Sequence, residues 1–156
     1  MDIQVSLDYR KNELEQLPIS ALARFVLAHE EAPEDAEVSI SFVTDEEIAG
    51  LNEAYRGIPG PTDVLSFECD QADAGERDWG APAEADAAYV LGDVVIAPDV
   101  ARRQAEEFGT GFEDEIGLLL VHGLLHLCGY DHQDDDEALR MEALEREILG
   151  SWADRR

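Results

Sequence analysis

Three of the chain's four histidines, His122, His126 and His132, lie in the short stretch HGLLHLCGYDH at 122–132. Their spacing, H-x-x-x-H-x-x-G-x-x-H, is that of zinc hydrolases whose ligands lie on a helix and the turn after it. Residues i and i+4 project from one helix face, so His122 and His126 can share one ion at about 2.0–2.1 Å. Gly129 can adopt the left-handed conformation that turns His132 back as a third ligand. Three protein ligands leave the fourth zinc position open for water, as in catalytic sites.

The alternative interpretation is that two of these histidines are neutral core residues and the third lies on the surface. A buried pair within LLLVHGLLHLC would need hydrogen-bond partners that an apolar helix does not offer. A shared metal ion satisfies both, and we therefore favour the metal site. Cys128 lies two residues past His126, so it points away from the metal face and is interpreted as a core residue. The fourth histidine, His29, is interpreted as an ordinary helix residue.

The residue after the first histidine is Gly123, where zinc proteases of this spacing have a glutamate as general base. Glycine inside a helix costs about 1 kcal/mol relative to alanine, and it can allow close packing. Either way no carboxylate follows His122, which argues against a peptidase. Asp131, beside the third predicted ligand, could hydrogen-bond a ligand or water, or could cap the turn.

The elements that must position these residues follow from hydrophobic periodicity. Period-two alternation and short apolar runs predict strands at 2–9, 37–43, 64–68 and 89–97. Helical spacing predicts helices at 18–31, 45–55, 99–108, 112–128 and 135–149, the second of which begins with a capping box, TDEE. The helix at 112–128 is apolar nearly all round beyond its first turn, so it should be buried. This pattern predicts one α/β (α+β) domain with a four-stranded mixed sheet and about five helices.

The whole chain, 1–156, is predicted to be one domain, because this length supports one ordinary core and not two. The segment 70–88 is long, acidic and almost free of large aliphatic residues, which predicts a flexible loop within that domain. No apolar run approaches the about 18 residues of a membrane span, and the first residues are unlike a signal peptide. We therefore expect a cytoplasmic protein that does not bind membranes. In a reducing compartment Cys69 and Cys128 are expected to be buried thiols and not a disulfide.

Charge is the most unusual global feature. Eleven basic residues against 37 acidic ones give a net charge of −26, and Lys11 is the one lysine. Such a surface repels nucleic acid at low salt. One interpretation is that the partner is not acidic. The other is adaptation to a very salty cytoplasm, where the Debye length falls to about 3 Å at 1 M salt and self-repulsion is screened.

The sequence resembles the YbeY family of bacterial endoribonucleases, the rRNA maturation factors. The resemblance lies in HGLLHLCGYDH, in LNEAYRGIPGPTDVLSFE at 51–68 and in LGDVVIA at 91–97. It implies one zinc ion per chain held by His122, His126 and His132, and a functional arginine in the YRG motif, here Arg56. Three features depart from the family pattern: Glu68 stands in the place of a usual proline, the segment at 70–88 is long and acidic, and the net charge of −26 is at odds with an RNA-binding surface.

The same resemblance implies cleavage of single-stranded RNA in ribosomal RNA maturation, at the 3′ end of the small-subunit RNA, and in ribosome quality control. The implied partners are the ribosomal subunit, ribosomal proteins and GTPase assembly factors.

Zinc lowers the pKa of a bound water to about 7, so hydrolysis of a phosphodiester needs little help from a carboxylate. Arg56 supplies a planar fork suited to phosphate. Without the resemblance, a surface ion pair would be the slightly preferred interpretation of Arg56. The attacking group could be water or the 2′-hydroxyl of the RNA. Two other classes stay open: a zinc peptidase with a base from elsewhere, and a non-catalytic assembly factor stabilised by zinc, against which the count of three ligands argues.

Overall fold

Four strands and six helices lie within the residues that the computed structural model describes, 1–69, 89–131 and 133–155. In chain order they are β1 (Asp2–Ser6), α1 (Lys11–Leu14), α2 (Ile19–His29), β2 (Glu37–Phe42), α3 (Asp45–Arg56), β3 (Val64–Glu68), β4 (Val90–Ile96), α4 (Pro98–Phe108), α5 (Phe112–Leu127) and α6 (Asp135–Asp154). The strands form one sheet in the order β1-β2-β4-β3. Strand β3 is antiparallel to β4, and the other pairs are parallel. The predicted α/β domain with a four-stranded mixed sheet is confirmed.

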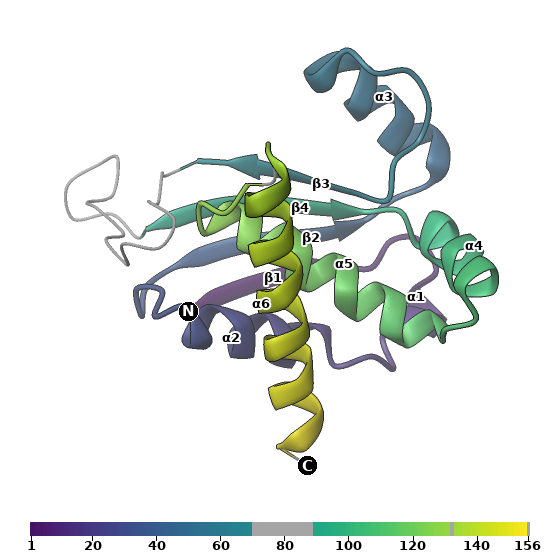
Figure 1. Cartoon of the computed structure of the whole chain (residues 1–156). Coiled ribbons are helices and arrows are strands. Elements are labelled where there is room, and N and C mark those ends of the chain that lie inside the picture. The colour runs from purple at the N-terminus through teal and green to yellow at the C-terminus, as the bar shows by residue number, and fades with distance from the viewer. Residues whose placement is uncertain (70–88, 132, 156) are drawn as a thin grey trace.

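The two faces of the sheet are covered unequally. On one face the main core packs α2, α5 and α6 against the strands, and on the other a smaller cluster packs α3 and Val100 of α4. Figure 1 shows α5 and α6 in front of the strands and α3 beyond β3. Successive strand residues point to opposite faces, so Val94 faces the main core while Val95 joins a smaller cluster beneath α3 with Ile48 and Leu65. Helix α5 packs on β3 and β4 and is covered by α2, α4 and α6. Helix α5 is buried, as predicted, because the sheet and these three helices pack around it.

Helix α3 begins and ends as its sequence dictates. The Thr44 side chain accepts a hydrogen bond from the Glu47 backbone N–H at 3.2 Å, and the Glu47 carboxylate accepts one in return from the Thr44 backbone N–H. At the other end Gly57 takes the left-handed conformation, with a φ of 69°, and reverses the chain. Arg56 is therefore the last helical residue, at the start of the connection that returns to β3.

The N-terminal segment differs from the prediction of a strand over 2–9. Strand β1 ends at Ser6, and the Tyr9 hydroxyl donates to Asp99 Oδ2 at 2.6 Å. Arg10 donates from Nε to the other Asp99 oxygen, Oδ1, at 2.5 Å, and has a positive φ of 56°. These contacts with Asp99 join the segment before α1 to α4. Helix α1 has only four residues, which are too few to show helical periodicity in the sequence.

Helix α6 extends beyond its predicted end at 149. The helix continues through Gly150, and Trp152 beyond it is buried and packs edge to face on Phe25 at 5.3 Å between ring centroids. The gain from burying this indole outweighs the cost of a helical glycine.

The two cysteines form no disulfide, as predicted, but only one of them is buried. Cys128 lies in the main core, and burial, with a smaller contribution from Glu30, raises the pKa of its thiol. Cys69 is exposed, so the prediction of burial is wrong for it. It directly follows the edge strand β3, which ends at Glu68.

The predicted flexible loop at 70–88 lies outside the described residues. Within the described ranges no helix combines the length and the hydropathy that crossing a membrane requires.

Candidate active site

A cleft of about 430 Å³ lies alongside the edge strand β3. Its described lining combines the end of α3, the connection to β3, one side of that strand, α5 and the residue before His132, and consists of Arg56, Thr62, Asp63, Val64, Leu65, Ser66, Glu68, His122, His126 and Asp131. The structure thus brings the predicted functional arginine into the same cleft as two of the three predicted zinc ligands, from segments far apart in the chain.

The two described histidines have the geometry of a shared ligand pair. Their Nε2 atoms lie 3.2 Å apart, one helical turn from each other on α5. Two nitrogens bound to one tetrahedral ion at about 2.0–2.1 Å lie about 3.3–3.4 Å apart. Both side chains are only partly buried, so the pair is accessible from the cleft. The donor set therefore fits a zinc ion.

The predicted third ligand, His132, lies outside the described residues. Among the residues that are described, no group of three or more His, Cys, Asp or Glu side chains is arranged to hold a metal ion. The turn that leads to His132 is described, and Gly129 has a φ of 99°, as its role at the helix end predicts. Asp131 lines the cleft directly before the third predicted ligand.

Glu145 on α6 contacts His122 and was not identified from the sequence. One of its carboxylate oxygens, Oε1, lies 2.5 Å from Nδ1 of His122. Glu145 is buried, although the other buried residues of α6 are the apolar Met141, Ile148 and Trp152. A carboxylate on Nδ1 fixes the ring so that Nε2 faces a metal. The signal in the sequence was one acidic residue at helical spacing in an otherwise apolar stripe, which periodicity alone cannot distinguish from a surface glutamate.

Gly123 is a packing residue. A Cβ atom built at this position would lie 2.7 Å from Cγ1 of Val94 and 3.1 Å from Cγ2 of Val64. The Ser66 hydroxyl donates to the Gly123 carbonyl oxygen at 2.8 Å. The structure therefore supports the close packing that the sequence suggested for this glycine, because a larger side chain here would collide with the sheet.

Arg56 is exposed and lines the cleft. Within the described part of the chain it makes no ion pair, whereas Arg10, Arg102 and Arg103 all pair with carboxylates. The sequence alone slightly favoured a surface ion pair for Arg56, but Arg56 forms none with the described residues. His29, interpreted as ordinary, contacts Glu30 at 2.8 Å and is not among the described cleft residues.

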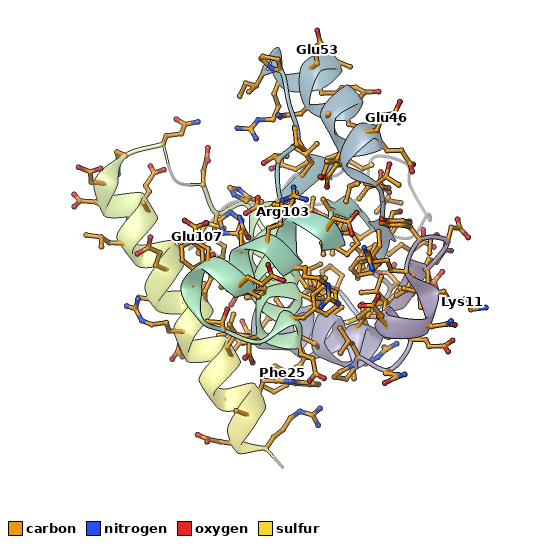
Figure 2. All side chains as sticks on the ribbon, turned by 90° about the vertical axis from the view of Figure 1, so that its right-hand side faces the viewer. Lys11, Phe25, Glu46, Glu53, Arg103 and Glu107 are labelled. Atoms are coloured by element: carbon orange, nitrogen blue, oxygen red, sulfur yellow. The ribbon has the colours of Figure 1, made fainter. Side chains whose placement is uncertain are left out.

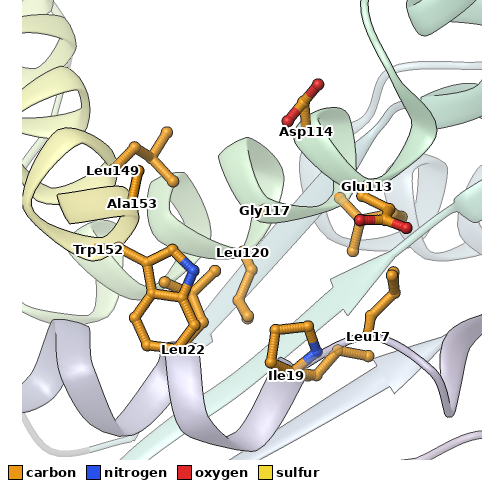
Figure 3. Close-up of a pocket in the computed structure, with 12 residues that line it drawn as sticks. Leu17, Ile19, Leu22, Glu113, Asp114, Gly117, Leu120, Leu149, Trp152 and Ala153 are labelled. Atoms are coloured by element: carbon orange, nitrogen blue, oxygen red, sulfur yellow. The ribbon is translucent and has the colours of Figure 1, made fainter. Parts of the chain in front are cut away.

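A second cavity, of about 370 Å³, lies toward the other end of α5. Figure 3 shows Leu22, Leu120, Leu149 and Trp152 around it, with Glu113 and Asp114 nearer its rim. No histidine or cysteine is among its described lining residues. Its lining therefore differs from that of the histidine cleft, where imidazoles and a guanidinium come together.

Comparison with known proteins places the chain in a family. A family model described as Endoribonuclease YbeY matches residues 2–153. A relative named Endoribonuclease YbeY from Frankia alni is 43% identical over 152 residues, which cover 97% of this chain and 83% of the relative. Its counterpart from Geobacillus thermodenitrificans is 45% identical over 152 residues, with 96% of each chain covered.

A solution structure of a Thermotoga maritima protein has the same fold, with a TM-score of 0.59 at 24% identity, and the match covers 98% of this chain and 93% of the other. The sequence matches span nearly the whole chain, including the cleft segments. The chain therefore belongs to the endoribonuclease YbeY family.

Proposed function

We propose that this protein is a zinc-dependent endoribonuclease, a hydrolase that cuts single-stranded RNA during ribosomal RNA maturation and ribosome quality control. The observation that carries the proposal is the meeting of Arg56 with the imidazoles of His122 and His126 in one cleft. The relatives' name, Endoribonuclease YbeY, supplies the reaction class. The 3′ end of the small-subunit RNA is the proposed site of action.

The proposed metal ligands are His122, His126 and His132, with one zinc ion per chain. The spacing of the two described Nε2 atoms supports this assignment. When bound, zinc would supply a Lewis acid that polarises a phosphate oxygen and activates water at neutral pH. Glu145 holds the His122 ring through Nδ1, so the metal-facing nitrogen stays oriented.

The chain's own residues explain why a phosphodiester suits this cleft better than a peptide. Arg56 presents a planar guanidinium that can pair with two phosphate oxygens and stabilise the negative charge that develops on them. Position 123, where a zinc protease has its glutamate, is packed against Val94 and Val64. The nucleophile is either water or the 2′-hydroxyl that the RNA itself provides.

The proposed partners are single-stranded ribosomal RNA and the ribosomal subunit, together with ribosomal proteins or GTPase assembly factors. The proposed location is the cytoplasm, where these partners assemble. No membrane partner is proposed.

The test is metal analysis combined with cleavage assays on the purified protein. The wild type should contain about one zinc ion per chain and should cut single-stranded RNA, leaving duplex RNA and casein intact. His126→Ala should lose both the zinc and the cleavage. Undiminished zinc in His126→Ala would refute the ligand assignment, and cleavage of casein would support a peptidase instead. Full zinc occupancy without RNA cleavage would support a structural role for the metal.

A further inference from the structure

Tyr55 is the most exposed large hydrophobic side chain among the described residues, with 70% of its surface accessible. It immediately precedes Arg56, in the last turn of α3. Single exposed hydrophobic residues are common, so exposure alone indicates nothing. What distinguishes it from the similarly exposed Phe108 on α4 is that it directly precedes the cleft arginine in the chain and packs on β3.

The Tyr55 ring packs against a second aromatic ring, that of Phe67 on β3. It meets the ring of Phe67 edge to face, with centroids 5.1 Å apart and planes inclined by 67°. Phe67 is itself partly buried against the cluster beneath α3. The tyrosine is therefore a supported ring with open surface, and ordering it on a ligand costs little conformational entropy.

Strand β3 places this aromatic pair close to the cleft. The strand is at the edge of the sheet, and its residues alternate between the two faces. Ser66 lines the cleft together with Glu68, while Phe67 between them points to the α3 side. An RNA strand that crosses β3 would meet the cleft on one face of the sheet and the Tyr55 ring on the α3 side.

We propose that Tyr55, supported by Phe67, is a stacking platform for an unpaired base of the RNA next to the phosphate that Arg56 binds. The proposal rests on the proposed function and adds to it a base-binding subsite. Bases in a duplex are already stacked and cannot lie flat on the ring, so the platform favours single strands.

The net charge supplies a physical reason for such a subsite. With a net charge of −26, this surface cannot rely on many phosphate contacts to hold RNA. Stacking of a base on an aromatic ring contributes affinity without requiring positive charge, and it tolerates any base because each has a flat face. Tyr55 therefore provides a source of RNA affinity that the acidic surface does not oppose.

The test compares Tyr55→Ala, Tyr55→Phe and Tyr55→Leu with the wild type on a short single-stranded RNA. Tyr55→Ala should raise KM about fivefold to a hundredfold, while the zinc content stays unchanged and the melting temperature falls only as far as the lost contact with Phe67 requires. Tyr55→Phe should retain most of the wild-type KM, and Tyr55→Leu should not. Phe108→Ala is the matched control, since it removes an aromatic ring that is 64% exposed on α4, and it should leave KM unchanged.

An abasic scan of the same RNA identifies the base. Removing the base at one position near the cut should weaken wild-type cleavage and should have no further effect on Tyr55→Ala. A Tyr55→Ala variant that cuts like the wild type, or a Tyr55→Leu variant that equals Tyr55→Phe, would overturn the platform alone. A wild type that cuts no RNA would overturn the proposed function as well, so the two failures are distinguishable.

Discussion

Arg56 and Glu145 are proposed to have different roles at the predicted metal site. Arg56 is exposed, reaches the cleft from the end of α3 and makes no ion pair within the described ranges. Glu145 is buried, and its carboxylate contacts Nδ1 of His122. Arg56 is therefore proposed to bind the substrate, and Glu145 to orient a metal ligand. Their substitutions should separate accordingly.

Arg56→Ala should lower cleavage about a hundredfold to a thousandfold, because a donor aimed at developing charge typically contributes that much. Zinc content and melting temperature should stay near wild type, since the side chain is exposed. Arg56→Lys should recover only part of the activity, because a point charge cannot reproduce a bidentate fork. Single-turnover cleavage measures the effect, and Arg140→Ala, on the exposed side of α6, is the control for loss of one positive charge. Normal cleavage by Arg56→Ala would show that the residue has no catalytic role, and loss of zinc would make its role structural.

Glu145→Gln should weaken zinc affinity about tenfold to a hundredfold, the usual effect of replacing a residue that orients a metal ligand. The amide keeps the size of the side chain but not the charge that holds His122. Competition with a chelator measures the affinity directly and does not depend on activity. Glu142→Gln, on the exposed face of the same helix, should leave affinity unchanged. A purely structural glutamate would instead lower the melting temperature and leave zinc affinity at the wild-type value.

At the level of elements, the contact between α5 and the sheet sets the position of the histidines. Gly123 lets the helix approach Val94 and Val64, and the Ser66 hydroxyl bonds to its carbonyl oxygen. These contacts fix the distance between β3 and α5, and side chains from both elements line the cleft. A change in the distance between β3 and α5 should alter both the free energy of unfolding and the shape of the cleft.

Gly123→Ala should destabilise the protein although alanine is the better helix former. The new Cβ would meet the stiff, buried Val94 at 2.7 Å. Overpacking of this kind costs about 1–3 kcal/mol, and the helix propensity of alanine offsets about 1 kcal/mol of it. Urea denaturation should therefore show a net loss in the free energy of unfolding. Gly150→Ala is the control, because its Cβ meets nothing within 4 Å, and it should stabilise α6. Equal gains in both variants would contradict the packing role of Gly123.

At the level of the whole molecule, negative charge dominates the surface. Figure 2 shows Glu46 and Glu53 projecting outward from α3, near the end of the molecule that carries Arg56. RNA approaching the cleft therefore crosses a repulsive field before it reaches the guanidinium. Added salt weakens both the long-range repulsion between the protein and RNA and the attraction between Arg56 and a phosphate. The rate of cleavage rises with salt as long as the loss of repulsion is the larger of the two effects.

RNA cleavage should accordingly have its optimum above ordinary physiological salt. The measurement is the initial rate against salt concentration, with thermal unfolding recorded in the same buffers. Stability should also rise with salt if the acidic surface is an adaptation to a salty cytoplasm. A monotonic fall in rate from low salt upward would mean that local attraction in the cleft dominates. Maximum stability and activity near zero added salt would exclude the adaptation.

The sequence by itself determined the features that are encoded locally. Strand alternation, helical spacing, the capping box at Thr44 and the left-handed turn at Gly129 each depend on a few neighbouring residues, and the structure contains all of them. The i, i+4 spacing likewise fixed that His122 and His126 share one helix face. The family motifs were also recognisable, since they are continuous segments.

Only the tertiary structure decided which distant segments meet. The order β1-β2-β4-β3 puts β3 at the sheet edge, and this placement brings Arg56 to the histidines and sets Tyr55 on Phe67. The packing of α6 across α5 brings Glu145 to His122. These contacts depend on strand order and helix packing, which minimise the exposed apolar surface of the whole chain and which no short window of sequence specifies.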